Sequence, residues 1–345
     1  MKNYDVTIGI PIYRAKQFIR QTMDSALAQT YPSIEFLIVD DCGEDGTIDI
    51  VEEYKESHPR GKDIRIIRHQ RNMGVSAARN RILDEAQGCY LYFMDADDTI
   101  VEDTIRLLWD ELHRYNAEVA YGSYQMTDNY SSESSTKVIK YPNIQLLGED
   151  SFATYMFKQY GVFQSSVCNC LIDLAFLRRI GIRCLDVSYW EDMAFTHDLA
   201  VWVSRAVLLS EVTYQYNCHA DSLSNYQERD FIKREEVLQN VYVLKYLKGL
   251  CKRVQSKPYL PYLCYEVGMN CFYVVCHIVK KREKITPAIS VKEMREYMTF
   301  PVSKNVLSCF RRKSLSNLML WIIPQLPIWL FLPVVTALGK VKKVL

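Results

Sequence analysis

The sequence predicts an α/β protein built on a mainly parallel β-sheet with helices on both faces, followed by a helical C-terminal extension. Two observations support this prediction. Short apolar runs alternate with helical patterns over roughly the first 125 residues, which is typical of parallel strands joined by crossover helices. Polar and acidic residues stand directly after these runs, at the strand ends where ligands of such sheets bind.

The individual elements follow from the same alternation. Strands are predicted at residues 6–10, 36–39, 64–67, 90–94 and 118–122, and helices at residues 16–29, 47–57, 76–87 and 102–115. The Ser-rich stretch 127–137 predicts a loop, and residues 150–232 return to mixed structure. Residues 231–284 have a long, aromatic-rich helical pattern.

Composition indicates a folded chain whose charge is unevenly distributed. Apolar residues make up 49% of the sequence, so a substantial core is expected. Residues 1–232 hold 22 Lys and Arg against 35 Asp and Glu, a net charge of −13, whereas residues 233–345 hold 20 against 6, a net charge of +14. The basic C-terminal third predicts an anionic partner, either lipid headgroups or nucleic acid.

The cysteines and the N-terminus bear on the compartment. The eleven cysteines are scattered without C-x-x-C pairs or zinc spacing, and we interpret this as a sign of a reducing compartment. The strand pattern begins at Val6, and no signal-peptide pattern precedes it. We therefore expect no secretion.

The first two strands end in residues suited to a nucleotide. Pro11 fixes the turn after the first strand, and Tyr13 offers an aromatic face to a base, although an ordinary turn explains both equally well. Asp41 follows the second strand and could accept hydrogen bonds from a base or a ribose, whereas Asp40 is interpreted as structural. A helix cap or an Asx turn is the alternative.

The third and fourth strands end in charged motifs. Ser76 is predicted to cap the next helix, and Arg79 in its first turn could bind a diphosphate bidentately, unless it is a surface arginine. Asp95, Asp97 and Asp98 place three carboxylates within four residues. Such a cluster favours a hard divalent cation, Mg²⁺ or Mn²⁺, with an acidic turn capping the following helix as the alternative.

Taken in order, these motifs resemble the inverting, bacterial-type family 2 glycosyltransferases of the GT-A fold. The residues that carry the resemblance are Pro11-x-Tyr13, Val39-Asp40-Asp41, Asp45-Gly46-Thr47, the segment from Gly74 to Asn80, and Asp95-x-Asp97-Asp98. The resemblance implies a nucleotide-sugar donor, usually a UDP-sugar, near Pro11, Tyr13, Asp41 and Arg79. It also implies a metal on Asp97, with Asp95 supporting the metal or the donor ribose, and leaves Asp98 as a helix cap.

Two further segments match the family. Glu191 and Asp192 resemble its acidic pair at a helix start, where the resemblance implies that Asp192 is the catalytic base and Glu191 its neighbour. Acids in a first helical turn also suit the helix dipole, which is the structural alternative. His219, followed by Ser222, resembles a histidine that contacts diphosphate or metal, although a lone histidine is more often structural.

The resemblance implies sugar transfer to a hydroxyl of a glycan or lipid-linked acceptor in surface polysaccharide synthesis. The expected parts are a catalytic domain at 1–230, with donor binding in 1–125 and the acceptor side in 126–230, a basic helical region at 231–313, and a membrane-associating tail at 314–345. A nucleotidyltransferase and a non-catalytic membrane-associated scaffold are the alternatives. A dinucleotide-binding dehydrogenase is disfavoured, because no G-x-G-x-x-G follows the first strand.

The C-terminal segment 318–338 is almost wholly apolar and long enough to span a bilayer if helical. Pro324, Pro327 and Pro333 interrupt it, and basic residues flank it on both sides. We therefore expect a re-entrant or in-plane anchor that attaches a cytoplasmic protein to the inner face of the cell membrane, with no nucleic-acid partner. A buried helix or a dimer contact is the alternative.

Overall fold

The computed structural model describes residues 4–128, 135–159, 161, 163–219 and 229–344. The chain forms two compact units. The first comprises Met1–Phe152 and Ser165–Ser222, and the second comprises Ala153–Gln164 and Leu223–Leu345. The predicted functional division at residues 230 and 313 stays a prediction.

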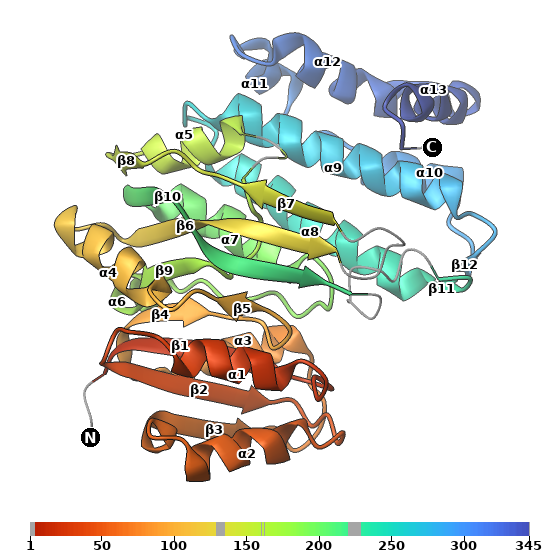
Figure 1. Cartoon of the computed structure of the whole chain (residues 1–345). Coiled ribbons are helices and arrows are strands. Elements are labelled where there is room, and N and C mark those ends of the chain that lie inside the picture. Colours follow the sequence, from red (N-terminus) through yellow and green to blue (C-terminus); the bar gives the residue numbers. More distant parts are fainter. Residues whose placement is uncertain (1–3, 129–134, 160, 162, 220–228, 345) are drawn as a thin grey trace. The chain divides into compact units, whose positions relative to one another are not determined.

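The first unit contains a large mixed sheet in the order β3-β2-β1-β4-β9-β6-β10-β5, with β7 beside β6 and β8 beside β10 (Figure 1). The strands are β1 (Tyr4–Ile12), β2 (Ile34–Asp40), β3 (Ile64–Arg68), β4 (Gly88–Phe93), β5 (Thr99–Ile100), β6 (Val119–Asp128), β7 (Ser135–Ile139), β8 (Ile144–Leu147), β9 (Cys170–Asp173) and β10 (Arg205–Cys218). The first four long strands, β1 to β4, pair in parallel. Their pairing confirms the predicted parallel core.

Helices flank this sheet, as predicted (Figure 1). They are α1 (Ile19–Leu27), α2 (Thr47–Ser57), α3 (Val75–Glu85), α4 (Thr104–Arg114), α6 (Leu174–Ile180) and α7 (Glu191–Trp202), with a short 3₁₀ turn η1 (Gly61–Asp63) and α5 (Ser151–Lys158), which lies at the division between the units. Consecutive residues of β1 and β2 are buried, as expected for strands covered on both faces.

Two expectations from the sequence are corrected. The fifth predicted strand does not extend the parallel set directly, because β9 inserts between β4 and β6 and is antiparallel to both. The predicted loop at 127–137 is wrong at both ends, because β6 continues to Asp128 and β7 begins at Ser135. Most side chains of β7 are exposed, and a polar edge strand of this kind lacks the apolar alternation that identifies a strand in a sequence.

The second unit is helical. Its elements are β11 (Ile232–Lys233), α8 (Arg234–Arg253), α9 (Leu260–Lys280), β12 (Ile285–Thr286), α10 (Val291–Tyr297), α11 (Lys304–Ser308), α12 (Ser314–Ile322), the 3₁₀ turn η3 (Ile323–Gln325) and α13 (Ile328–Val341). α9 packs against α8, α10, α12 and α13 and is its core helix. In the part of the chain that the structure describes, α9 alone has the length and apolar composition of a membrane span, and 67% of its most apolar window is buried in the protein.

The apolar C-terminal segment is broken where its prolines predict. α12 ends at Ile322, η3 contains Pro324, and α13 begins directly after Pro327. α13 has 14 residues, which corresponds to about 21 Å of helix and is less than the roughly 30 Å of a bilayer core. Neither helix alone can span a membrane.

Candidate active site

The site lies where β1, β2 and β4 end side by side. Met94, just beyond β4, donates its N–H to the carbonyl of Gly9 in β1 (3.1 Å), and Asp41, just beyond β2, donates its N–H to the carbonyl of Ile12 (2.9 Å). Parallel pairing thus brings the motifs that follow these strands to one edge of the sheet.

Asp98 has a structural position within the acidic turn. Its carboxylate accepts hydrogen bonds from the hydroxyl of Tyr214 (2.7 Å) and from the backbone N–H of Asn217 (2.8 Å), both in β10. Burial, followed by the charges of Asp97 and Asp95, raises the pKa of Asp98 well above its usual range. The expectation that Asp98 caps the next helix is wrong, because α4 starts at Thr104 with Asp103 at its N-cap. Asp98 instead ties the acidic turn to β10.

Asp97 lies beside the predicted histidine. Its Oδ2 is 2.7 Å from Nε2 of His219, and the imidazole stacks on Phe18 with ring centroids 4.4 Å apart. Burial and the nearby charge of Asp95 raise the pKa of Asp97, against the lowering effect of the histidine. The side chain is still 34% exposed, so this carboxylate remains accessible from solvent.

Arg79 joins the acidic turn to the start of α7. Its guanidinium donates from Nη2 to Oδ1 of Asp95 (2.8 Å) and from Nη1 to Oε1 of Glu191 (2.5 Å). The arginine side chain is only 5% exposed, so both ion pairs are largely shielded from water. Its buried Nε has no hydrogen-bond partner among the described residues. The surface alternative for Arg79 is therefore wrong.

The two acids at the start of α7 differ in their surroundings. Glu191 is buried against Arg79, and burial raises its pKa even though the guanidinium lowers it. Asp192 is partly exposed and accepts a hydrogen bond from the N–H of Met193 (2.7 Å). Burial, followed by the charge of Glu191, raises the pKa of Asp192 to about 7. A carboxylate with this pKa can accept and release a proton near neutral pH.

Asp41 organises the loop before α3. Its Oδ1 accepts hydrogen bonds from the N–H of Met73 (2.8 Å) and lies 2.7 Å from Nδ1 of His69, and its Oδ2 accepts from the N–H of Gly74 (2.8 Å). Its side chain is almost fully buried. The structure therefore gives Asp41 a structural role, while its contact with a nucleotide stays a prediction.

Pro11 and Tyr13 lie at the end of β1. Pro11 pairs with Val39 of β2, and Tyr13 is 44% exposed, with the guanidinium of Arg14 5.2 Å from its ring centroid. An exposed aromatic ring at this edge is free to stack on a planar group. The stacking itself stays a prediction.

α3 makes a set of contacts with the segment before α7 that the sequence did not predict. The amide of Asn80 donates to the carbonyl of Cys184 and accepts from its N–H, both at 2.9 Å. Ser76 donates its hydroxyl to the carbonyl of Val187 (2.7 Å). The prediction that Ser76 caps α3 is wrong, because Gly74 is the N-cap. The four-residue spacing of Ser76 and Asn80 on one helix face was the available signal.

The acidic turn fits a divalent cation that binds together with a phosphate ligand. No group of three or more His, Cys, Asp or Glu side chains in the described part of the chain could hold a metal alone. Asp95 and Asp97 provide two carboxylates, one of them partly buried with a raised pKa, and a cation would relieve their repulsion. Mg²⁺ commonly binds through one or two carboxylates and substrate phosphates.

Comparisons with known proteins bear on the family to which this chain belongs. The model of glycosyl transferase family 2 matches residues 7–179. The chain is 32% identical over 160 residues to glycosyltransferase GlyA of Streptococcus pneumoniae, which covers 46% of this chain and 21% of that protein. It is 28% identical over 252 residues to the Escherichia coli UDP-Glc:alpha-D-GlcNAc-diphosphoundecaprenol beta-1,3-glucosyltransferase WfaP, covering 71% and 90%. The chain thus spans from about a fifth to nine tenths of the length of these relatives.

Solved structures show the fold. Residues 1–349 of TarS from S. aureus, in complex with UDP-GlcNAc, superpose with a TM-score of 0.65 at 14% identity, covering 93% of this chain and 90% of that fragment. The mannosyltransferase PcManGT from Pyrobaculum calidifontis, in complex with GDP-Man and Mn²⁺, gives a TM-score of 0.55 at 15% identity, covering 94% and 86%. With a family match over half of its length and a fold of the GT-A type, this chain belongs to glycosyl transferase family 2.

Proposed function

We propose that the chain is an inverting, metal-dependent glycosyltransferase that transfers a sugar from a UDP-sugar to a hydroxyl of a glycan or lipid-linked acceptor. The observation that carries this proposal is the bridge from Asp95 through Arg79 to Glu191. It joins the strand-end motif that would hold the donor diphosphate to the helix start that presents Asp192. Donor and base would thereby lie on one connected set of side chains.

In the proposed reaction, the Asp192 carboxylate takes the proton of the acceptor hydroxyl as its oxygen attacks C1 of the sugar. The bond between C1 and the diphosphate oxygen breaks, the nucleoside diphosphate leaves with the bonding electrons, and the configuration at C1 inverts. When bound, Mg²⁺ or Mn²⁺ supplies positive charge that stabilises the leaving diphosphate. Asp97 and Asp95 would hold it there, and Arg79 would keep Asp95 in place.

Tyr13 and Asp41 complete the proposed donor site. The exposed ring of Tyr13 would stack on the base, and Pro11 fixes the turn that presents this ring. Asp41 would support the site by holding the 69–74 loop, through the hydrogen bonds described above. His219 would orient Asp97 from the other side of the acidic turn.

The acceptor and the location are inferred from relatives. WfaP is named for transfer onto alpha-D-GlcNAc-diphosphoundecaprenol, and we infer a lipid-linked acceptor of similar chemistry here. Such an acceptor resides in a membrane, so the proposal places this chain at the inner face of the cell membrane, attached through its C-terminal region, with a role in surface polysaccharide synthesis.

The test is a donor screen that measures release of UDP or GDP from a panel of nucleotide-sugars, with and without Mn²⁺. Asp97→Ala and Asp192→Ala should each abolish transfer, whereas Asp110→Ala, which removes an exposed carboxylate of α4, should leave it unchanged. Mn²⁺ should strengthen UDP binding to the wild type, and this strengthening should be lost in Asp97→Ala. Transfer by Asp192→Ala at the wild-type rate would place the base elsewhere, and no turnover of any donor by the wild type would favour the scaffold alternative.

A further inference from the structure

The two C-terminal helices α12 and α13 are apolar on their inner and outer sides. On the inner side of α12, fully buried Asn317 donates its amide to the carbonyl of Pro261 in α9 (2.8 Å). A methyl group added at Gly268 of α9 would come within 2.9 Å of Leu320 Cδ1, so the two helices are in close contact. The inner sides are therefore already used to cover α9.

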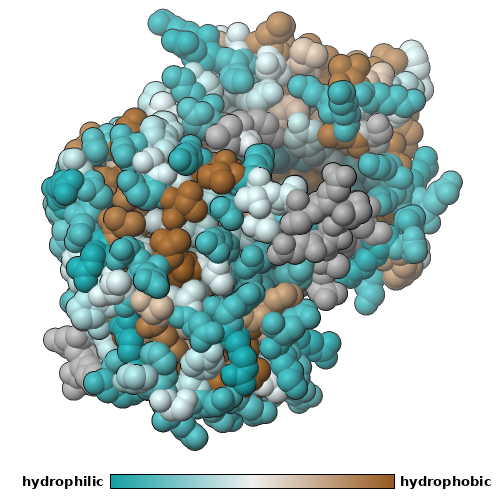
Figure 2. Space-filling view, in the orientation of Figure 1, coloured by the Kyte–Doolittle hydropathy of each residue, from teal (hydrophilic) through white to brown (hydrophobic). Residues whose placement is uncertain are grey.

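The outer side of α12 carries an exposed apolar stripe. Its four side chains are 41–71% exposed and follow the spacing i, i+3, i+4, i+7 of one helix face: Leu315, Leu318, Met319 and Ile322. Figure 2 shows hydrophobic residues at the molecular surface over this part of the chain. A helix that is apolar all round is normally covered on both sides.

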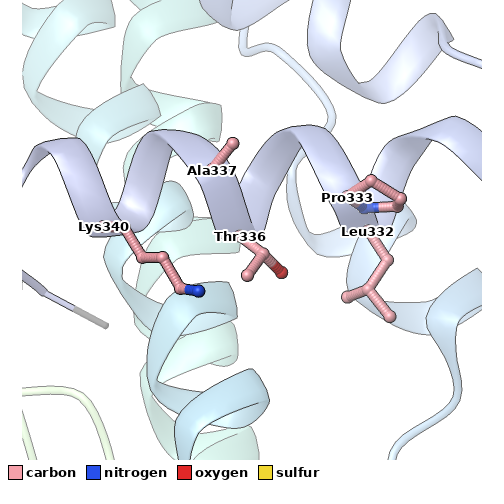
Figure 3. Close-up of a pocket in the computed structure, with 5 residues that line it drawn as sticks. All are labelled: Leu332, Pro333, Thr336, Ala337 and Lys340. Carbon is pink, nitrogen blue, oxygen red and sulfur yellow. The ribbon is translucent and has the colours of Figure 1, made fainter.

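α13 also exposes apolar side chains. Its buried face consists of Phe331, Val335 and Gly339, and its first turn exposes Ile328 (49%) and Trp329 (73%). Farther along, Leu332, Thr336 and Lys340 point to one side of the helix and line an open depression with Pro333 and Ala337 (Figure 3). We call the side chains of Leu315, Leu318, Met319, Ile322, Ile328 and Trp329 the C-terminal docking surface.

The charges of the C-terminal segment after Glu296 have one sign. After Glu296 the sequence contains seven Lys and Arg and no Asp or Glu. Three of these cations precede α12 and three stand at the end of α13, and all six are exposed: Arg311, Arg312, Lys313, Lys340, Lys342 and Lys343. The apolar surface is thus flanked at both ends by cations.

Exposed apolar side chains together with flanking cations favour one kind of partner over another. A symmetric second copy would bring two all-cationic edges together, which is unfavourable for like charges. An anionic bilayer instead offers an apolar boundary layer for the side chains and phosphates for the flanking Lys and Arg. Trp329, exposed in the first turn of α13, suits the interfacial position that tryptophan prefers in membranes.

We propose that the C-terminal docking surface lies in the plane of an anionic lipid bilayer, with its apolar side chains at the headgroup–acyl boundary and the flanking cations at lipid phosphates. This inference rests on the proposed function only for the reason to bind a membrane, because a lipid-linked acceptor requires the enzyme to work at one. It replaces a spanning or re-entrant tail with a surface that the folded unit already presents.

The test measures binding of the full chain to vesicles of phosphatidylcholine alone or with 30% phosphatidylglycerol, by co-flotation. We expect binding to the anionic vesicles and a blue shift of tryptophan emission that Trp329→Phe removes. The double variant Leu315→Ser/Trp329→Ser should lose binding, whereas Tyr242→Ser, which alters an aromatic side chain of α8 that is 53% exposed, should retain it.

Charge is tested separately. Changing Lys340, Lys342 and Lys343 together to Gln should weaken binding by about fivefold per charge, or roughly 100-fold in all. The matched triple Lys245→Gln/Lys252→Gln/Arg282→Gln removes three exposed cations elsewhere in the unit and should have a much smaller effect. Equal binding of the wild type to neutral and anionic vesicles would overturn the proposal. So would a dimer in solution that Leu315→Ser/Trp329→Ser dissociates without any vesicle binding.

Failure of docking and failure of the proposed function give different results. Release of UDP from a donor by the chain in detergent, with a water-soluble acceptor, needs no bilayer. A chain that turns over its donor but ignores anionic vesicles refutes the docking surface alone. A chain that binds the vesicles as expected but turns over no donor refutes the proposed function alone.

Discussion

Replacing Asp192 by Asn should inactivate the enzyme and stabilise it, with a gain in stability that depends on pH. The carboxyl group has a pKa of about 7 in the folded protein, against 3.8 for its ordinary value, chiefly because of burial. The neutral form is therefore favoured in the folded state. Its stabilising contribution is fully present below about pH 4 and is lost as the pH rises through about 7. Asn stays neutral throughout and can still accept the hydrogen bond from Met193.

The magnitude follows from the pKa shift. About three pKa units correspond to about 4 kcal/mol, and because Asp192 is partly exposed, solvent screening lowers the expected difference to about 2 kcal/mol. For 345 residues, with an unfolding entropy of about 2.1 cal/mol/K per residue, that is about 3 °C in Tm. Thermal unfolding in EDTA should show equal Tm values for the two proteins near pH 4, and a higher Tm for Asp192→Asn above pH 7.

The same variant has a kinetic signature. Wild-type transfer should rise with pH along a limb with an apparent pKa near 7, because only the ionised carboxylate can take the acceptor proton. Asp192→Asn should lose about 10²–10⁴-fold of this rate at every pH. Donor affinity should change little, because Asp192 is assigned to the acceptor side.

Asp84 provides a control of opposite sign. Hydrogen bonds from Arg183 to both of its oxygens lower its pKa, so its stabilising effect is present above its unfolded pKa and is lost in acid. Asp84→Asn should therefore lower Tm at neutral pH and keep transfer. A Tm difference between Asp192→Asn and the wild type that stays constant from pH 4 to 8 would refute the assignment of the raised pKa to Asp192.

Three further variants probe how α3 supports the site. Gly9→Ala places a methyl group 2.4 Å from Cγ2 of Ile82; it should push α3 off β1 and cost about 1–3 kcal/mol of unfolding free energy, measured by denaturation. Asn80→Ala removes both hydrogen bonds to the Cys184 backbone and should lower kcat with donor Kd unchanged, whereas Asn80→Asp, which keeps the acceptor, should recover part of the rate. Arg79→Lys keeps the charge but lacks the planar fork that bridges the two carboxylates. Calorimetry should show weaker Mn²⁺ binding, and kinetics should show a lower kcat. Wild-type values for both would exclude a role for the Arg79 bridge in the site.

The strand ends could be predicted because they depend on local pattern. The runs that form β1 to β4 are buried on both faces and read as continuous apolar segments, and parallel pairing fixes where the residues after them must meet. The position of β9 could not be predicted in the same way. Its four residues come far along the chain from the strands that they separate, and a short apolar run does not specify its partners.

The site was predictable in its composition and less so in its connections. Asp95 and Asp97 stand out as acids directly after an apolar strand, and the Glu191–Asp192 pair was predicted from its resemblance to the family's motif. The partners of Arg79 could not be predicted, because a sequence does not show where a guanidinium points. The expected partner was a diphosphate, whereas the structure shows two carboxylates from distant segments. Asn80 was not predicted, because a neutral amide that hydrogen-bonds to a backbone segment leaves no charge pattern in the sequence.

The charge of the site explains why donor and cation should bind as one unit. The guanidinium of Arg79 pairs with Asp95 and Glu191, and Asp97 and Asp192 stand close to these two acids in the sequence. The four carboxylates and the one guanidinium have a formal charge of −3 when all are ionised. Burial, and after it the charge of a neighbouring carboxylate, raises the pKa values of Asp97 and Asp192, so ionising all four acids together is already unfavourable. A diphosphate adds further negative charge, so Mn²⁺ should raise the affinity for UDP, and UDP should raise the affinity for Mn²⁺ by the same factor, because the linkage is reciprocal. Titration calorimetry of each ligand with and without the other measures both factors, and independent binding would mean that the cation does not lie between the acidic turn and the diphosphate.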